Sequence, residues 1–318
     1  MGYSNVYGVP RWGQHEADGA AVIDGKAIAA KLRTDVAADV ASMVAAGGVA
    51  PGLATILVGD DQASQIYVDA KHRACAEVGI RSIDHREPSD CSPERLATLI
   101  EQLNADPEVN GILLQLPLPR GLDSATFIDL IDPAKDVDGL STASAGALWR
   151  SRPGLSPCTP TGVMELLSYS GAELAGANAV IVGRSELVGK PLAAMLLSAN
   201  ATVTVCHSHT RDLEARCANA DVLVAACGQP KALGSGHVKA GAVVIDVGIT
   251  RTEGGLVGDV DYDAVRSIAA AITPVPGGVG PMTIACLLRN TLRATELGLA
   301  GSQARPGQSS SGHRGALS

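Results

Sequence analysis

The chain has 318 residues, enough for about two domains of ordinary size. Hydrophobic residues make up 46% of the sequence and charged residues 18%, a composition that is typical of globular α/β enzymes and excludes wholesale disorder. The formal net charge of −8 argues against a surface that attracts nucleic acid or anionic lipid, so an anionic ligand needs a local site.

The cysteines and the chain ends indicate the compartment and the extent of the folded part. The seven cysteines are never spaced C-x-x-C, which predicts no disulfide framework and no bound metal and favours the reducing cytoplasm. No apolar run approaches the roughly 18 residues that span a bilayer, and the start lacks the apolar segment of a secretory signal. Residues 1–18 and 301–318 are polar and rich in Gly or Pro, so we expect both to be disordered.

Between the ends, apolar strand-like runs alternate with helical patterns, which predicts parallel sheets covered by helices. In the first half the pattern predicts helices over residues 25–46, 63–78 and 93–104 and strands over residues 53–58, 80–85 and 110–116. In the second half it predicts helices over residues 190–199 and 212–219 and strands over residues 179–182, 202–206, 222–226, 243–247 and 271–273. We therefore expect a two-domain α/β fold whose second unit is Rossmann-like.

Two Pro- and Gly-rich stretches, residues 152–160 and 274–281, bracket the second unit and predict two crossings between domains. The last helix, about residues 282–297, then returns to the first unit. The predicted division is a catalytic unit of residues 19–156 plus 281–300 and a nucleotide-binding unit of residues 157–280. The cleft between such units is the usual place for a ligand.

The second unit contains a glycine turn that favours phosphate binding. The strand at 179–182 runs into Gly183-Arg-Ser-Glu-Leu-Val-Gly189, after which a helix begins. The match to G-x-G-x-x-G is imperfect, because Ser185 takes the second glycine position and the next glycine comes one residue late. The alternative is a plain strand-to-helix turn that binds nothing.

The end of the next strand distinguishes two cofactors. An NAD site usually has an acidic residue here for the ribose hydroxyls, but residues 206–209 read Cys-His-Ser-His. Arg184, Ser185 and Ser208 are suited to a 2′-phosphate, so the sequence predicts NADP. The alternative makes Arg184 a solvated surface residue. Neighbouring strand residues point to opposite faces, which argues against a metal bound by the Cys and His residues.

The first unit carries a smaller set of candidate residues. Ser64, Tyr67 and Lys71 are spaced to share one helix face, although such a stripe is also ordinary helix surface. Gln115 is the one polar residue of an apolar run and lies at its carboxyl end, where it either serves a ligand or bonds loop backbone. Asp138, just before a glycine, either forms a turn or holds a heterocycle edge by two hydrogen bonds.

At this point the sequence resembles the bifunctional methylenetetrahydrofolate dehydrogenase/methenyltetrahydrofolate cyclohydrolase family, over about residues 20–298. The motifs that carry the resemblance occur in order: Tyr67-x-x-x-Lys71, Gln115-Leu-Pro-Leu-Pro119, Lys135-Asp-Val-Asp-Gly139, Pro157-Cys-Thr-Pro160, Gly183-Arg-Ser-x-x-Val-Gly-x-Pro191, Gly241-Ala-Val-Val-Ile-Asp-Val-Gly248, Val257-Gly-Asp-Val260 and Thr273-Pro-Val-Pro-Gly-Gly-Val-Gly-Pro-Met-Thr283. The last motif is close to diagnostic.

The resemblance implies that 5,10-methylenetetrahydrofolate passes hydride to NADP and that water then opens the methenyl product to 10-formyltetrahydrofolate, both in one cleft. It implies that Lys71 is the central catalytic residue, that Tyr67 and Gln115 position it, and that Asp138 grips the pterin with Ser64 alongside. The resemblance also implies a homodimer. It assigns further residues to folate, Pro276, Gly277, Gly280 and Thr283, and to the cofactor, Gly183, Arg184, Ser185, Gly189, Ser208 and Ile249.

The chain departs from the family after Leu140, where members commonly read an asparagine before Gly-Arg-Leu and this chain reads Ser144-Ala-Gly-Ala147-Leu. The loss of an amide and a charge affects the packing of a loop beside the cleft. Two alternatives stand beside the family reading. One is a different NADP oxidoreductase of the shikimate dehydrogenase type, and the other is a non-catalytic nucleotide-binding relative.

Hydride transfer builds an iminium-like cation that a charged lysine would oppose. We therefore hypothesise that Lys71 is partly desolvated, with a lowered pKa, and is oriented for proton transfer by hydrogen bonds to Gln115 and Tyr67.

Overall fold

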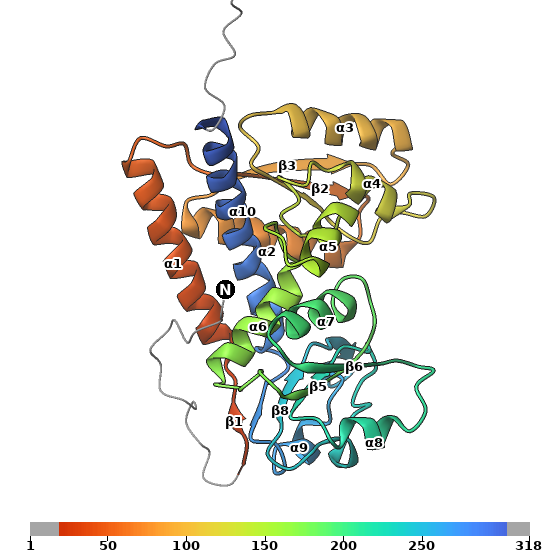
Figure 1. Cartoon of the computed structure of the whole chain (residues 1–318). Coiled ribbons are helices and arrows are strands. Elements are labelled where there is room, and N and C mark those ends of the chain that lie inside the picture. The colour runs from red at the N-terminus through yellow and green to blue at the C-terminus, as the bar shows by residue number, and fades with distance from the viewer. Residues whose placement is uncertain (1–18, 304–318) are drawn as a thin grey trace, which may run out of the picture.

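Two parallel sheets, joined by long helices, organise residues 19–303, which are the residues that the computed structural model describes (Figure 1). The segments 1–18 and 304–318, predicted to be disordered, lie outside the described residues. The expected two-domain α/β architecture is confirmed, with the smaller sheet in one lobe and the larger sheet in the other. No helix among residues 19–303 is long and apolar enough to cross a bilayer.

The first lobe contains a three-stranded sheet whose middle strand is buried along its whole length. Its strands in spatial order are β3 (Arg81–Glu87), β2 (Gly52–Val58) and β4 (Gly111–Leu114). The helices of this lobe are α2 (Gln62–Val78), α3 (Pro93–Ala105) and α4 (Ser124–Leu130), while α5 (Thr142–Trp149) packs against α7 of the second lobe, Gly189–Ser198. In α3, Leu96 and Ile100 share one face and pack in the cluster that contains Ile56 and Ile112 of the sheet. All three predicted strands of this unit are present.

The second lobe contains a six-stranded parallel sheet with a Rossmann-like core. Its strands in spatial order are β1 (Ala21–Val22), β11 (Ala271–Ile272), β8 (Val243–Asp246), β7 (Val222–Ala225), β5 (Asn178–Val182) and β6 (Thr202–Cys206). The remaining elements are α7 (Gly189–Ser198), α8 (Leu213–Cys217), η1 (Ser235–His237), β9 (Thr250–Thr252), β10 (Gly255–Val257) and α9 (Tyr262–Val265). The five predicted strands are present, and β1 is an addition. Ala21 and Val22 pair with β11 although the sequence analysis places them with the first unit, because a two-residue strand has no readable period.

Three helices connect the lobes, and Figure 1 shows α1 and α10 running side by side. They are α1 (Gly25–Ala45), α6 (Cys158–Tyr169) and α10 (Val279–Gln303). The sequence analysis missed α6, which starts inside a Pro-rich stretch, because proline is tolerated in the first turn of a helix. The expected disorder of residues 301–303 is wrong, since α10 continues through them. Extending an existing helix adds one hydrogen bond for each residue fixed, so propagation past the predicted end is easy.

A buried carboxylate ties together the loops at the carboxyl end of β8. Asp246 is only 4% exposed and accepts hydrogen bonds from the backbone N–H groups of Gly248 (3.0 Å), Asp259 (2.9 Å) and Val260 (2.9 Å). Burial raises the pKa of Asp246 to about 6, and the charge of Asp259 adds to the shift while the backbone donors oppose it. The folded state therefore holds this proton more tightly than the unfolded chain does.

We expect the stability that Asp246 contributes to fall as the pH rises. A carboxyl with a raised folded-state pKa stabilises the fold most when both states are protonated, and that stability is lost as the pH climbs through about 6. Asp246→Asn keeps the shape but does not titrate. Between about pH 5 and pH 7.5, urea unfolding should show the wild type losing about 1 kcal/mol relative to the variant. A difference that stays constant or moves the other way would contradict the assignment.

Candidate functional site

A lysine on α2 meets a glutamine at the end of β4. The Lys71 Nζ atom donates a hydrogen bond to Gln115 Oε1 at 2.9 Å, and the Gln115 Nε2 atom donates to the carbonyl of Leu116 at 2.7 Å. The amide is thereby held so that its oxygen faces the lysine. The structure brings together these two predicted site residues, which are distant in sequence, at the carboxyl end of a parallel strand.

Asp138 is the charged partner of this pair. Both Lys71 and Asp138 are half-buried. Burial lowers the pKa of the Lys71 ammonium, and the negative charge of Asp138 opposes that shift. Burial likewise raises the pKa of the Asp138 carboxyl, and the positive charge of Lys71 opposes that shift. Desolvation therefore moves both groups toward their neutral forms, which is the direction hypothesised for Lys71.

The segment that carries Asp138 is anchored by residues that the sequence analysis did not single out as site residues. The Asn290 Nδ2 atom on α10 donates to the carbonyls of Val137 at 2.9 Å and Ser156 at 2.8 Å. The Cys158 thiol donates to the same Val137 carbonyl at 3.3 Å. Cys158 stood in a recognised motif, whereas Asn290, between Arg289 and Thr291, carries no sequence signal that distinguishes it.

The expectation of a loop at Ser144–Ala147 is wrong, because these residues lie in helix α5, which Ser141 caps by accepting a hydrogen bond from the Ser144 N–H at 3.2 Å. Ser144 is buried and its Oγ atom donates to Asp136 Oδ2 at 2.7 Å, while Ser141 donates through its backbone N–H to the same oxygen at 2.9 Å. Asp136 therefore ties the start of α5 to the segment that carries Asp138. The buried hydroxyl of Ser144 thus has a hydrogen-bond partner.

The other two residues of the predicted stripe on α2 have different surroundings. The Ser64 Oγ atom and backbone N–H both donate to Asp61 Oδ2 at 2.8 Å, so Asp61 caps the helix and fixes the serine. Tyr67 is 53% exposed, and no hydrogen bond of its phenol is found among residues 19–303. The hypothesised bond from Tyr67 to Lys71 is therefore absent, because the phenol lies at the surface rather than beside the amine.

The glycine turn after β5 brings two backbone segments into close approach. Gly183 has φ +137°, and a Cβ atom there would overlap the carbonyl of Ala226. A Cβ atom on Gly189 would overlap the carbonyl of Gly183. No side chain caps the start of α7, while Arg184 and Ser185 are exposed beside it. This is a cradle of the kind that phosphate oxygens occupy, and the residues present fit a dinucleotide.

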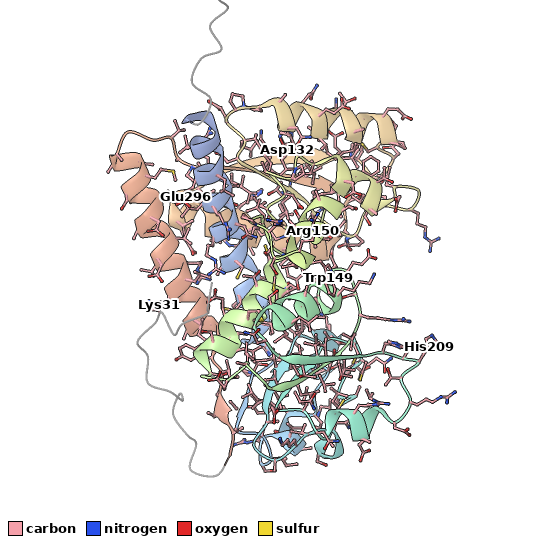
Figure 2. The ribbon with its side chains drawn as sticks, in the orientation of Figure 1. Lys31, Asp132, Trp149, Arg150, His209 and Glu296 are labelled. Carbon is pink, nitrogen blue, oxygen red and sulfur yellow. The ribbon has the colours of Figure 1, made fainter. Side chains whose placement is uncertain are left out.

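The end of β6 contains the third predicted phosphate contact. Ser208 is exposed, and His209 projects from the outer edge of the second lobe (Figure 2). Desolvation and then the charge of Arg184 lower the pKa of His207, so the arginine acts electrostatically at this strand end. No group of three or more His, Cys, Asp or Glu side chains in the described part of the chain is arranged to hold a metal.

The Pro- and Gly-rich loop before α10 connects the two units. The hydroxyls of Thr159 on α6 and Thr283 on α10 are hydrogen-bonded at 2.9 Å. A Cβ atom on Gly280 would lie 3.3 Å from the side chain of Ile249, which is itself 46% exposed. The predicted folate and cofactor positions thus meet at this loop. Pro276 and Gly277 precede the helix in the same segment, and Gly277 has φ +115°.

A cavity of about 710 Å³ spans the two units. Leu116 and Gly139, the neighbours of Gln115 and Asp138, line it from one side, and Arg184 and Ser185 line it from the other. Trp149, another lining residue, lies between the lobes in Figure 2. Lys71 and Asp138 are not among the lining residues, so this cavity adjoins the lysine site rather than containing it. Its volume is in the usual range for small-molecule sites.

We expect Gly183→Ala to lower the free energy of unfolding by about 3 kcal/mol, because the new Cβ atom combines a strained φ with backbone overlap. The matched control is Gly176→Ala, where φ is +80° but the new atom meets nothing within 4 Å. There we expect about 1 kcal/mol from the backbone alone. Equal losses for the two variants in urea unfolding would rule out a close approach at the turn.

Comparison with family models gives two matches that follow each other along the chain. Residues 23–138 match the tetrahydrofolate dehydrogenase/cyclohydrolase catalytic domain, and residues 157–298 match the NAD(P)-binding domain of the same family. The first match contains the Lys71 site and the second contains the glycine turn.

Whole-chain comparisons agree. A bifunctional FolD protein of Frankia alni is 59% identical over 275 residues, which cover 86% of this chain and 96% of that protein. The crystal structure of a FolD methylenetetrahydrofolate dehydrogenase/cyclohydrolase from Campylobacter jejuni aligns with a TM-score of 0.86 and 44% identity, covering 87% of this chain and 99% of that one. The Trypanosoma brucei enzyme, solved with NADP and an inhibitor, aligns with a TM-score of 0.84 and 40% identity, covering 88% and 99%.

Proposed function

Because the chain belongs to the tetrahydrofolate dehydrogenase/cyclohydrolase family, we propose that a single cleft with Lys71 at its centre carries two successive reactions. The chain is an NADP-dependent enzyme that oxidises 5,10-methylenetetrahydrofolate to 5,10-methenyltetrahydrofolate and hydrolyses this product to 10-formyltetrahydrofolate. The observation that carries the assignment of Lys71 is its 2.9 Å hydrogen bond to Gln115 beside the charge of Asp138. The shikimate-dehydrogenase-like and non-catalytic alternatives are not favoured, because both units match this one family.

Lys71 has the environment that the second reaction needs. NADP, when bound, supplies the hydride acceptor. Oxidation leaves a cationic carbon on the folate, and a fully charged lysine would oppose it. Since burial lowers the pKa of Lys71, its amine is nearer the neutral form and is suited to take a proton from the attacking water. Gln115 fixes the direction of the amine, so we assign it a positioning role.

Asp138 is proposed to bind the substrate rather than to carry out chemistry. A carboxylate that faces the N–H groups of a pterin makes paired hydrogen bonds and fixes the ring orientation. The Asn290 and Cys158 bonds to Val137 support this role, because they hold the backbone next to Asp138 in place. Ser64 and Tyr67 are proposed to lie along the folate, with the exposed phenol of Tyr67 facing the ligand.

The cofactor is proposed to lie across the glycine turn. Gly183 and Gly189 allow close approach of phosphate oxygens to the start of α7. Arg184, Ser185 and Ser208 would hold the 2′-phosphate through charge-assisted hydrogen bonds. Residues proposed to line the folate and nicotinamide region are Pro276 and Gly277 of the loop before α10, Gly280 and Thr283 at the start of α10, and Ile249 after β8.

Three broader assignments are part of the same proposal. The folate unit is residues 19–156 with 281–300 and the cofactor unit is residues 157–280, with Ala21–Val22 lending a strand to the second sheet. We propose a homodimer, since most homo-oligomers are symmetric dimers and the family resemblance implies one. We propose a cytoplasmic enzyme, because the scattered free cysteines suit a reducing compartment.

The proposal is tested by absorbance with 5,10-methylenetetrahydrofolate, following NADPH formation and the rise and decay of the methenyl product, with NADP and NAD in parallel. NADP-dependent reduction with methenyl decay above the uncatalysed rate is the expected result. Preference for NAD would overturn the cofactor assignment, and reduction without enhanced decay would overturn the second activity.

Lys71→Met is expected to separate the two reactions. Methionine keeps most of the volume but has no proton acceptor, so cyclohydrolase kcat should fall by about 100-fold or more while folate and NADP binding persist. The matched control is Lys31→Met, a half-exposed lysine on α1, which should leave both rates unchanged. Cyclohydrolase activity within a few fold of wild type in Lys71→Met would contradict the acid–base assignment.

Asp138→Ala is expected to damage both reactions together. Loss of a paired, charge-assisted contact costs about 2–3 kcal/mol of binding, so kcat/KM should fall about 30- to 150-fold for each substrate. Asp39→Ala, on the exposed side of α1, is the control and should change neither value. Selective loss of one reaction with unchanged folate affinity would instead make Asp138 a catalytic group.

A further inference from the structure

A second cavity, of about 530 Å³, lies among α6, α7, α10 and the chain between α5 and α6. None of the residues assigned above to folate or cofactor lines it within the described part of the chain. Its volume falls in the range of roughly 300–1,000 Å³ that is usual for small-molecule sites. We call it the arginine pocket, after the three arginines that line it, Arg152, Arg289 and Arg293.

The arginine pocket carries an excess of positive charge. Glu165 is its one acidic lining residue, and this carboxylate pairs with Arg289 across 2.7 Å. Arg152 and Arg293 are exposed, and neither forms an ion pair within residues 19–303. The pocket therefore carries two positive charges without an acidic partner, although the net charge of the whole protein is −8. Arginine side chains without an acidic partner can hold an anionic ligand by charge-assisted hydrogen bonds.

The remaining lining groups suit an anion with an organic part. Ser151, Ser156 and Ser198 line the pocket, and the hydroxyls of Ser151 and Ser198 lie 3.3 Å apart in a mutual hydrogen bond. Serine hydroxyls can donate to phosphate oxygens. Leu148 and Met195 form an apolar wall. The planar guanidinium fork matches the geometry of phosphate and makes paired, charge-assisted hydrogen bonds. The size, the charge and the mixed lining together describe a phosphate-bearing small molecule rather than a single bare ion.

We propose that the arginine pocket is a second ligand site, distinct from the catalytic cleft although Leu148 borders both, that binds a phosphate-bearing small molecule through Arg152 and Arg293. Arg289 donates a hydrogen bond to Glu165 at 2.7 Å, and both side chains line the pocket. The next residue on the helix, Asn290, also lines the pocket and donates to the Val137 carbonyl at 2.9 Å, so the pocket shares a wall with the segment that carries Asp138.

The test is calorimetric titration of inorganic pyrophosphate into the full chain saturated with NADP, so that the phosphate cradle at the glycine turn is already occupied, at constant ionic strength and without divalent cations. We expect saturable binding with one site, unchanged in Arg184→Gln, because Arg184 belongs to the cofactor cleft and not to the pocket. The double variant Arg152→Gln/Arg293→Gln should weaken binding by at least tenfold. Its dehydrogenase rate should stay within twofold of wild type, which shows that it is folded. Arg150→Gln is the matched control, an exposed neighbour that does not line the pocket (Figure 2).

Three results would overturn the proposal. The first is the absence of saturable pyrophosphate binding to the wild type. The second is binding that is lost in Arg184→Gln and kept in the double variant, which would place the ion in the cofactor cleft. The third is equal weakening by Arg150→Gln and the double variant, which would mean diffuse surface attraction. Succinate, titrated in parallel, should bind at least tenfold more weakly, and equal binding of this dicarboxylate would overturn the phosphate class.

Discussion

Placing a lysine and an aspartate together in a half-buried recess is the constraint on which the rest of this structure depends. Desolvation shifts the pKa of each group toward the neutral form, and the charge of the other opposes the shift. Such a pair persists only where neighbours satisfy its remaining hydrogen-bonding groups. Gln115 does this for Lys71, and the bonds to the Val137 carbonyl hold the backbone beside Asp138. Burial lowers the pKa of Lys71 more than the charge of Asp138 raises it, which suits the amine to accept a proton. A lysine in open water would stay charged.

The architecture follows from the need to bring these groups together. Lys71 comes from a helix, Gln115 from the end of β4 and Asp138 from the loop that follows α4. The loop at Gly183 comes from the other sheet, and the large cavity spans both. Parallel sheets place such loops at one edge, so two sheets joined by helices can present their loops to a common space. Helices α1, α6 and α10 pack in one hydrophobic cluster with residues of both sheets, and this shared core joins the two lobes.

The sequence predicted those parts whose causes are local. The apolar runs of β2, β5 and β7 have clear patterns, and the glycine turn has a geometry that few other residues allow. Prediction failed where tertiary contacts decide. Strand β1 is too short to show a period, the exposure of Tyr67 depends on what packs beside it, and the anchoring by Asn290 needs the fold to bring α10 against Val137. The spacing of Lys71 and Gln115 along the chain made both of them candidate site residues but gave no distance between their side chains.

Helix α10 also sets the order in which the protein becomes complete during synthesis. It supplies Thr283 to the bond with Thr159, Arg289 to the pair with Glu165 and Asn290 to the carbonyl beside Asp138. Ribosomes make the chain from its N-terminus, so these partners emerge last. The segment beside Asp138 and helix α6 therefore lack these contacts until the final helix is made, and a product that stops before residue 279 never forms them. Completion of the chain is thus coupled to completion of the site.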